Sequence, residues 1–198
     1  MFSKNEKYLS YFYIIVFLIL SFKVDSNTDI KIKILDYLNS LQYFSASFIQ
    51  NDNENLSEGK VYIGKKRVRA DYLSPSKILI ILDEDKAMYY NYELEEDEFF
   101  NPKNTNAWFF YDVFRNPYFF EDSEIILKNK EIILKKSGFD NEENKYLINA
   151  YFENSPVILR KIEVFINDAF LQISIFDHNY NEDFDKNFFK LISPKLLN

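Results

Sequence analysis

The spacing of hydrophobic residues changes near residue 42 of the chain. Before that point, apolar side chains recur at intervals of three and four, which is typical of one face of an α-helix. We therefore expect a helix over residues 28–41, capped by Asn27 or Thr28, with Asp29 in the first turn where an acid favours the helix dipole. The residues that form its apolar face are Ile30, Ile34, Tyr37, Leu38 and Leu41.

From Tyr43 onward the period is two, which is the period of a strand with one buried face. Phe44, Ala46 and Phe48 fall on one side of the first such segment, and serines fall between them. The same alternation returns at residues 60–63, 67–72 and 158–166. Nearly continuous apolar segments occupy residues 77–82, 87–92 and 169–176, and shorter strands are expected at 124–127, 131–135 and 145–152.

The breaks between these segments are short and rich in Asn and Asp, which supply turns where glycine is scarce. They fall at residues 83–85, 129–130, 140–141 and 167–168. About ten strands joined by short turns predict an antiparallel meander. The predicted fold is mainly β (α+β): an unclosed antiparallel β-barrel or strongly curved sheet, with a first helix and a short helical lid over an apolar cavity.

The segment between Pro102 and Pro117 interrupts the strands with the sequence TNAWFFYDVFR. Its apolar residues fit a short helix that must be covered nearly all round. One interpretation is a plug that fills the end of a barrel core, and the other is a movable lid over a ligand cavity. One face of this helix would carry Ala107, Phe110, Tyr111 and Phe114, and the next Trp108, Phe109 and Val113.

Several strands are apolar on both faces, as in residues 169–176, yet few helices are predicted to cover the second face. Either the sheet curls on itself or an apolar ligand occupies its inside. Each buried methylene is worth roughly 0.8 kcal/mol, so part of an acyl chain would bind such a concavity without a polar anchor.

The amino terminus has the features of a targeting segment. Lys4 and Lys7 precede an apolar run over residues 11–22, which suits the hydrophobic region of a signal peptide and is short for a membrane span. We expect a signal peptide over residues 1–26, cleaved after Ser26 or Ser21, or retained as an anchor. A single exported domain over residues 27–198 would remain in the periplasm.

Composition narrows the classes of function. The 198 residues carry a formal charge of −7, with no cysteine and one histidine, His178. This acidity disfavours nucleic acid as a partner. The chain cannot form thiolate metal sites or use a cysteine nucleophile. His178 lies in the polar stretch DHNYNED, predicted to be a loop. We therefore expect no enzyme activity, no cofactor and no metal.

A basic cluster, Lys65, Lys66, Arg67 and Arg69, lies at a predicted turn of this acidic chain. It could meet an acidic partner or a phosphate, or it could be an ordinary hairpin tip.

Two stretches resemble the opening of the LolA family of periplasmic lipoprotein carriers: LNSLQYFSASFIQ and, after it, EGKVYIGKKRVRADYLSP. Phe44, Ala46, Phe48 and Gln50 match the family's F-x-A-x-F-x-Q strand, and Gly59 opens the next one. The residues from Lys65 to Tyr72, and then Pro75, correspond in position to the family's R-P-G motif and the residues that follow it. KILIILDEDKAMYYNYELEE and the terminal FFKLISPK resemble later strands, so the likeness covers most of residues 30–195.

The resemblance implies an unclosed barrel with a helical lid, in which the acyl chains of a lipoprotein are held against the apolar inner surface. It implies transfer from an inner-membrane Lol-type ABC transporter complex to an outer-membrane acceptor lipoprotein, by a monomer. Lys65 stands where the family has a lid-latching arginine, and lysine lacks the planar fork of that group, so Arg67 is the second candidate for the latch. We predict that cavity and lid are formed by Phe44, Ala46, Phe48, Val61, Ile63, Val68, Tyr72, Ile80, Tyr90, Trp108, Phe110, Tyr111, Phe114, Leu171 and Ile173.

Other functions remain open. The first is a general binding module for fatty acids or phospholipids. The second is a lipid sensor of the same fold, a type that carries a further domain for which this chain has no residues. An esterase would need His178 as its base.

Overall fold

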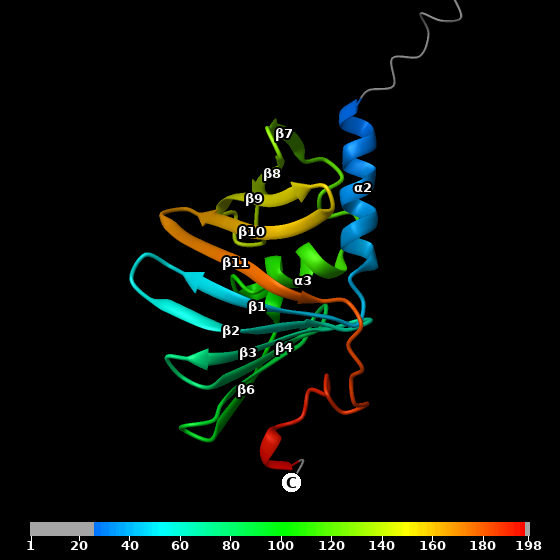
Figure 1. The fold of residues 1–198 in the computed structure, drawn as a ribbon. Helices are drawn as coiled ribbons and strands as arrows, with labels where there is room; N and C mark the ends of the chain where they lie inside the picture. The colour runs from blue at the N-terminus through cyan, green and yellow to red at the C-terminus, as the bar shows by residue number, and fades with distance from the viewer. Residues whose placement is uncertain (1–25, 197–198) are drawn as a thin grey trace, which may run out of the picture. The chain divides into compact units, whose positions relative to one another are not determined.

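The computed structural model describes residues 26–196 (Figure 1). These residues fall into two compact units, with the boundary between residues 32 and 33. The described residues of the first unit, 26–32, begin helix α2 (Ser26–Ser40), which the spacing of apolar residues placed at 28–41. The predicted signal peptide lies outside the described residues, apart from Ser26. The domain boundary predicted after it is not tested by the described residues.

The second unit is dominated by one antiparallel sheet, as predicted. Its described part contains eleven strands in the order β6-β5-β4-β3-β2-β1-β11-β10-β9-β8-β7. Two meanders, β1 to β6 and β7 to β11, are joined where β1 pairs with β11. The bounds are β1 (Phe44–Asn51), β2 (Leu56–Ile63), β3 (Val68–Ser74), β4 (Ile78–Leu82), β5 (Ala87–Asn91), β6 (Glu96–Phe100), β7 (Glu124–Lys128), β8 (Glu131–Phe139), β9 (Lys145–Asn154), β10 (Val157–Ile166) and β11 (Ala169–Asn179).

The turns follow the prediction that Asn replaces glycine. Asn129 and Asn167 connect β7 to β8 and β10 to β11, and both have positive φ angles, 53° and 51°. Asparagine enters this left-handed region more readily than most residues because its short polar side chain bonds locally.

Two segments differ from the predicted structure. Residues 96–98, where we predicted no strand, pair with β5 as part of the edge strand β6. Charged side chains on an edge strand discourage pairing with another chain, so acidity is compatible with a strand there. His178 lies near the end of β11 rather than in a loop.

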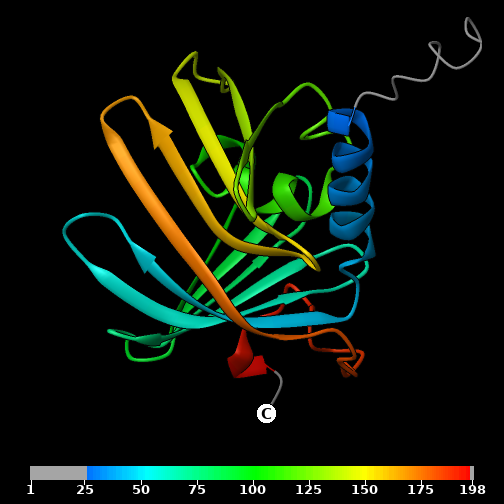
Figure 2. The same cartoon turned by 45° about the horizontal axis from the view of Figure 1, so that its top comes forward.

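The segment between β6 and β7 connects strands at opposite ends of the sheet order. It contains a short helical turn, η1 (Pro102–Asn104), and helix α3 (Trp108–Arg115). In Figure 2, α3 lies inside the curve of the sheet, between the two meanders. The chain therefore crosses the concave side of the sheet to reach β7, and this crossing places α3 there.

The outer face of β2 to β5 is covered by the carboxyl-terminal segment, which ends in η2 (Pro194–Leu196). Arg69 donates to the carbonyl oxygen of Phe188 at 2.8 Å, and its guanidinium carbon lies 4.0 Å from the centre of the Phe188 ring. The apolar residues buried beneath this segment are Leu79, Ile81, Met88 and Tyr90, with Leu191 packed on them.

Candidate functional site

A small apolar cavity lies between α3 and the concave face of the sheet. Ala107, Phe110 and Phe114 face it from one side of the lid segment, at spacings of three and four. The opposing wall comes from β1 to β4, β10 and β11. That wall consists of Phe48, Val61, Val68, Ala70, Tyr72, Ile80, Leu82, Ile162, Ile173 and Ile175.

No charged side chain lines this cavity in the described part of the chain. The most polar group in its wall is the Tyr72 hydroxyl, which donates to the Gln50 Oε1 atom at 2.8 Å. Burial raises the pKa of Tyr72 to about 12, so the phenol is neutral at any physiological pH. The cavity therefore offers a ligand dispersion and hydrophobic contacts, and its lining has almost no polar group that would bind water instead.

Eight of the residues that we predicted for the cavity and lid line it. They are Phe48, Val61, Val68, Tyr72, Ile80, Phe110, Phe114 and Ile173. Alternation identified those on β1, β2 and β3, because each of these strands has one face toward α3.

Four further predicted residues are buried or half-buried away from this cavity. Phe44, Ala46 and Ile63 are 2%, 1% and 0% exposed and belong to the closed core at the start of β1. Phe44 contacts the rings of His178 and Tyr180 instead. Leu171 lines a separate hollow with Phe109 at the start of β11.

Tyr90 lies on the opposite face of the sheet from the cavity. It pairs with Leu79, whereas Ile80, which lines the cavity, pairs with Tyr89. The prediction placed Tyr90 with Ile80 because β4 and β5 are apolar on both faces, which removes the alternation that fixes the face. The carboxyl-terminal segment covers this second face.

Trp108 and Tyr111 line a second hollow, formed with the turn β4–β5, η1, the loop after α3 and strands β8 and β9. Neither lines the apolar cavity. A helix that is apolar nearly all round gives no signal for which face is inside, and this ambiguity accounts for their different position.

Arg115, at the last turn of α3, ties this helix to other parts of the unit by hydrogen bonds. Its Nη2 donates to the Leu41 carbonyl oxygen at 2.6 Å, and its Nη1 donates to the Gly64 carbonyl oxygen at 2.9 Å. The Lys65 carbonyl oxygen is 3.5 Å from Nη1. The guanidinium is therefore on the lid, and the turn between β2 and β3 supplies acceptors.

This arrangement differs from the predicted latch, which placed the cationic side chain at Lys65 or Arg67. Lys65 contributes its backbone carbonyl. Arg67 forms an ion pair with Asp83 at 2.6 Å and donates to the Phe189 carbonyl oxygen at 2.9 Å, so it holds the carboxyl-terminal segment. Sequence reasoning missed Arg115, because donation to backbone carbonyls leaves no pattern in the acceptor residues.

The Arg115 hydrogen bonds stabilise the position of α3 only modestly, because burying the guanidinium costs free energy. Burial lowers the pKa of Arg115, and its Nε atom is buried without a partner among the described residues. No carboxylate of residues 26–196 forms an ion pair with it. Desolvation of the guanidinium thus offsets part of the gain from its charge-assisted hydrogen bonds. Helix α3 has eight residues and no side-chain cap at its start, so packing must supply its stability.

The cavity in this closed arrangement has a volume of about 70 Å³. Ligand pockets usually enclose about 300–1,000 Å³, and a single water takes about 30 Å³ of liquid. With α3 in this position the cavity is therefore smaller than a usual ligand pocket.

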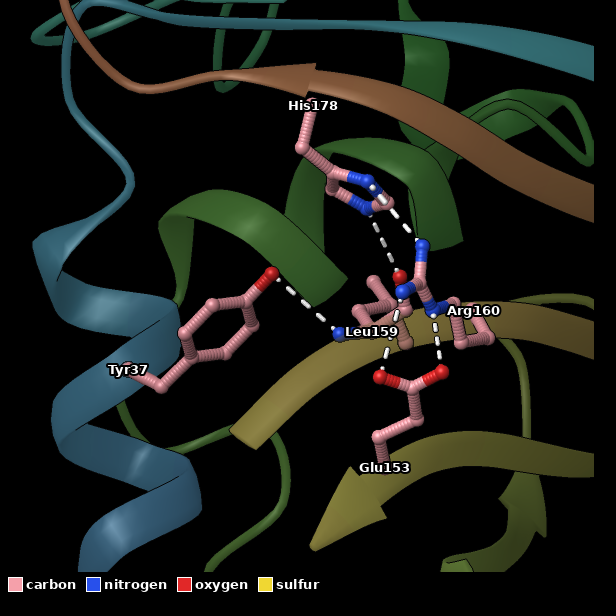
Figure 3. A network of polar contacts seen from close by, with 5 residues as sticks. All are labelled: Tyr37, Glu153, Leu159, Arg160 and His178. Carbon is pink, nitrogen blue, oxygen red and sulfur yellow. Dashed lines mark hydrogen bonds and ion pairs between the residues drawn. The ribbon is translucent and has the colours of Figure 1, made fainter. Parts of the chain in front are cut away.

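His178 belongs to a polar network on β9 to β11 (Figure 3). Its Nε2 lies 2.9 Å from the Leu159 carbonyl oxygen, and its Nδ1 lies 3.4 Å from the Arg160 Nη1. Arg160 is held by both carboxylate oxygens of Glu153, at 3.0 and 3.1 Å. The Tyr37 hydroxyl accepts from the Leu159 amide.

A neutral imidazole protonated on Nε2 satisfies both of these contacts. Burial, followed by the nearby Arg160 charge, lowers the pKa of His178, which favours that neutral form. Among the described residues, the hydrogen-bond partners of the ring are Arg160 and the Leu159 carbonyl oxygen, and neither is a serine or threonine hydroxyl. The network links β9, β10 and β11 through their side chains.

Two other features are absent from residues 26–196. These residues contain no cluster of three or more histidine and carboxylate side chains able to hold a metal ion. Within the same range, no helix has the length and apolar character required to cross a membrane.

The comparisons with known proteins concern this fold. Residues 39–191 match the family model described as outer membrane lipoprotein carrier protein LolA. The structure of an uncharacterized conserved protein from Thermus thermophilus is similar with a TM-score of 0.55 and 10% identity, over 86% of this chain and 96% of that one. This likeness shows the fold alone.

Two further structures are similar with TM-scores below 0.5. A chain of the Pseudomonas aeruginosa MucA/MucB complex is similar with a TM-score of 0.46 and 10% identity, over 79% of this chain and 60% of that one. The structure of MucB alone is similar with a TM-score of 0.46 and 8% identity, over 79% of this chain and 61% of that one. The present chain thus spans about three fifths of these proteins. No curated protein matches it.

Proposed function

We propose, starting from the fact that this chain belongs to the LolA family, that it binds the acyl chains of lipoproteins between α3 and the concave face of its sheet. The family consists of carrier proteins rather than enzymes. The observation that carries the proposal is a cavity with an uncharged apolar lining, closed by a short helix that one arginine ties to backbone carbonyls.

The proposed cycle uses two arrangements of α3. In the closed one, Phe110 and Phe114 fill the space that acyl chains would occupy, so the empty carrier does not expose its apolar face. In the open one, acyl chains replace these rings. Each methylene that leaves water contributes roughly 0.8 kcal/mol, so a few methylenes together offset a cost of about 2 kcal/mol for breaking the Arg115 contacts.

The proposal also includes the route. A signal peptide over residues 1–26 would export the chain to the periplasm as a monomer. There it would receive lipoproteins from an inner-membrane Lol-type ABC transporter complex and deliver them to an outer-membrane acceptor lipoprotein where one is present. No cofactor is required for this cycle.

The first test is a titration of the purified, delipidated protein with a synthetic triacylated lipopeptide, the same peptide without acyl chains, and a phospholipid below its aggregation concentration. Calorimetry should show one lipopeptide bound per protein and no binding of the unacylated peptide. Equal affinity for the phospholipid and the lipopeptide would favour the alternative, a general periplasmic lipid- or fatty-acid-binding module. Failure to bind either lipid would contradict both.

A further inference from the structure

The second hollow lies on the side of α3 that faces away from the apolar cavity. Its volume is about 360 Å³, within the usual range of about 300–1,000 Å³ for ligand sites. Trp108, Tyr111 and Asp112 of α3 form one wall, and residues of β8, β9 and their connecting turn form the other. The Asn141 side chain donates to the Lys103 carbonyl oxygen at 3.2 Å and so joins the turn between β8 and β9 to η1.

Aromatic rings make up much of this hollow. The Trp108 ring lies 5.1 Å from that of Tyr146 and 6.0 Å from that of Phe119, in edge-to-face arrangements. At the rim, Tyr118 and Phe139 are 72% and 71% exposed. Most of the surface of these two large rings is therefore left uncovered by the described part of the chain, and it borders the opening.

Gly138 of β8 is needed to seat one of these rings. A Cβ atom at this position would lie 2.7 Å from the hydroxyl oxygen of Tyr146. Any other residue at position 138 would push the Tyr146 ring out of place, so the backbone of β8 helps to shape the aromatic wall.

Asp112 supplies a carboxylate to the same hollow. It is half-buried and forms no ion pair with any lysine, arginine or histidine of residues 26–196. Burial raises its pKa, against the opposing effect of a hydrogen bond from Asn116. A carboxylate that is desolvated in this way gains more from a cation than an exposed one does.

The two lysines that line the hollow are already engaged with other acids. Lys136 lies 2.5 Å from the Asp122 carboxylate, and Lys103 lies 3.7 Å from that of Glu84. Both lysines also act on Asp112 at longer range, and each lowers its pKa less than the hydrogen bond from Asn116 does. The carboxylates that line the hollow, those of Glu84, Asp112 and Asp140, outnumber its two lysines.

We propose that this hollow binds an alkylammonium group, with Asp112 as its counter-ion and the rings of Trp108, Tyr111 and Tyr146 around its stem. Aromatic faces attract cations, tryptophan most strongly, and the carboxylate makes the site selective for a charged head over a neutral one. Two sources carry this chemistry: a lysine side chain of a bound polypeptide and the ethanolamine head of a phospholipid.

The site does not depend on the proposed function, since it shares no lining residue with the apolar cavity. It does share helix α3 with it. A cation bound by Asp112 would therefore contact the same helix whose Phe110 and Phe114 side chains pack toward the sheet.

The test uses small probes without acyl chains. Nα-acetyl-lysine amide and phosphoethanolamine are the two charged probes, and Nα-acetyl-norleucine amide is the neutral one. Trp108, the single tryptophan of the chain, provides a fluorescence signal in the hollow itself, and calorimetry provides an independent one. At least one charged probe should bind about tenfold more tightly than the neutral probe.

The near-isosteric Asp112→Asn change should weaken the charged probe about tenfold and leave the neutral probe unaffected. Glu98→Gln, the same chemical change on the exposed face of β6, should have no effect. Tighter binding of the lysine probe would identify a polypeptide as the source, and tighter binding of phosphoethanolamine a lipid head.

Two results would overturn the proposal: equal binding of the charged and neutral probes to the unaltered protein, or undiminished binding by folded Asp112→Asn. The first comparison needs no variant and stands even if the variant does not fold. Because none of the probes has an acyl chain, failure here leaves acyl binding untouched, and failure of the lipopeptide titration leaves this result untouched.

Discussion

Replacing Arg115 with glutamine is expected to release α3 from the sheet and to raise the apparent affinity for a triacylated lipopeptide. The change removes the donors to the Leu41 and Gly64 carbonyl oxygens. A hydrogen bond from a charged group contributes about 2 kcal/mol of net stability. The cost of desolvating this guanidinium lowers the total contribution of its two bonds below twice that value. If the closed state loses about 2 kcal/mol, the apparent affinity rises about 30-fold.

The matched control is Arg67→Gln. This change also removes a half-buried guanidinium, one that binds Asp83 and the Phe189 carbonyl oxygen and has no contact with α3. It should lower the free energy of unfolding without changing lipopeptide affinity by more than about twofold. Calorimetric titration of both variants makes the comparison. Equal effects of the two changes would remove Arg115 from the closing mechanism.

Replacing Phe110 with aspartate should abolish lipopeptide binding while the β-sheet signal in circular dichroism stays intact. Phe110 faces the apolar cavity from α3. The change removes a large apolar surface worth up to about 3 kcal/mol and adds a charge that acyl chains cannot solvate. Together these effects correspond to a loss of affinity greater than about 100-fold.

Phe110→Leu is the control for this change, because leucine keeps an apolar side chain at the same position. It should bind within about tenfold of the unaltered protein. Loss of cooperative thermal unfolding in Phe110→Asp would mean that α3 is a fixed plug in the core. That outcome would contradict a movable lid.

The sequence predicted the faces of strands well where one face was polar. In β1 to β3, alternation placed Phe48, Val61 and Val68 on the cavity side, and the structure has them there. In β4 and β5 alternation is lost, because the carboxyl-terminal segment buries the second face as well. Tyr90 was therefore assigned to the face opposite to the one it occupies.

The lid illustrates a second limit. Its position between two prolines and its helical spacing were visible in the sequence, but a helix with aromatic residues all round does not reveal which side meets the sheet. The latch was harder still to predict, because the acceptors of Arg115 are backbone carbonyls at positions 41 and 64. Which carbonyls lie near a side chain depends on the folded path of three separate segments.

The central claim is that acyl chains enter by displacing α3 from the concave face. Since the chain has no cysteine, Asn106→Cys beside α3 and Lys60→Cys on β2 would carry the two spin labels of a distance measurement, and both positions are exposed. Adding the triacylated lipopeptide should shift the label-to-label distances to longer values and saturate at one lipopeptide per protein. Saturating binding with an unchanged distance distribution would contradict the account.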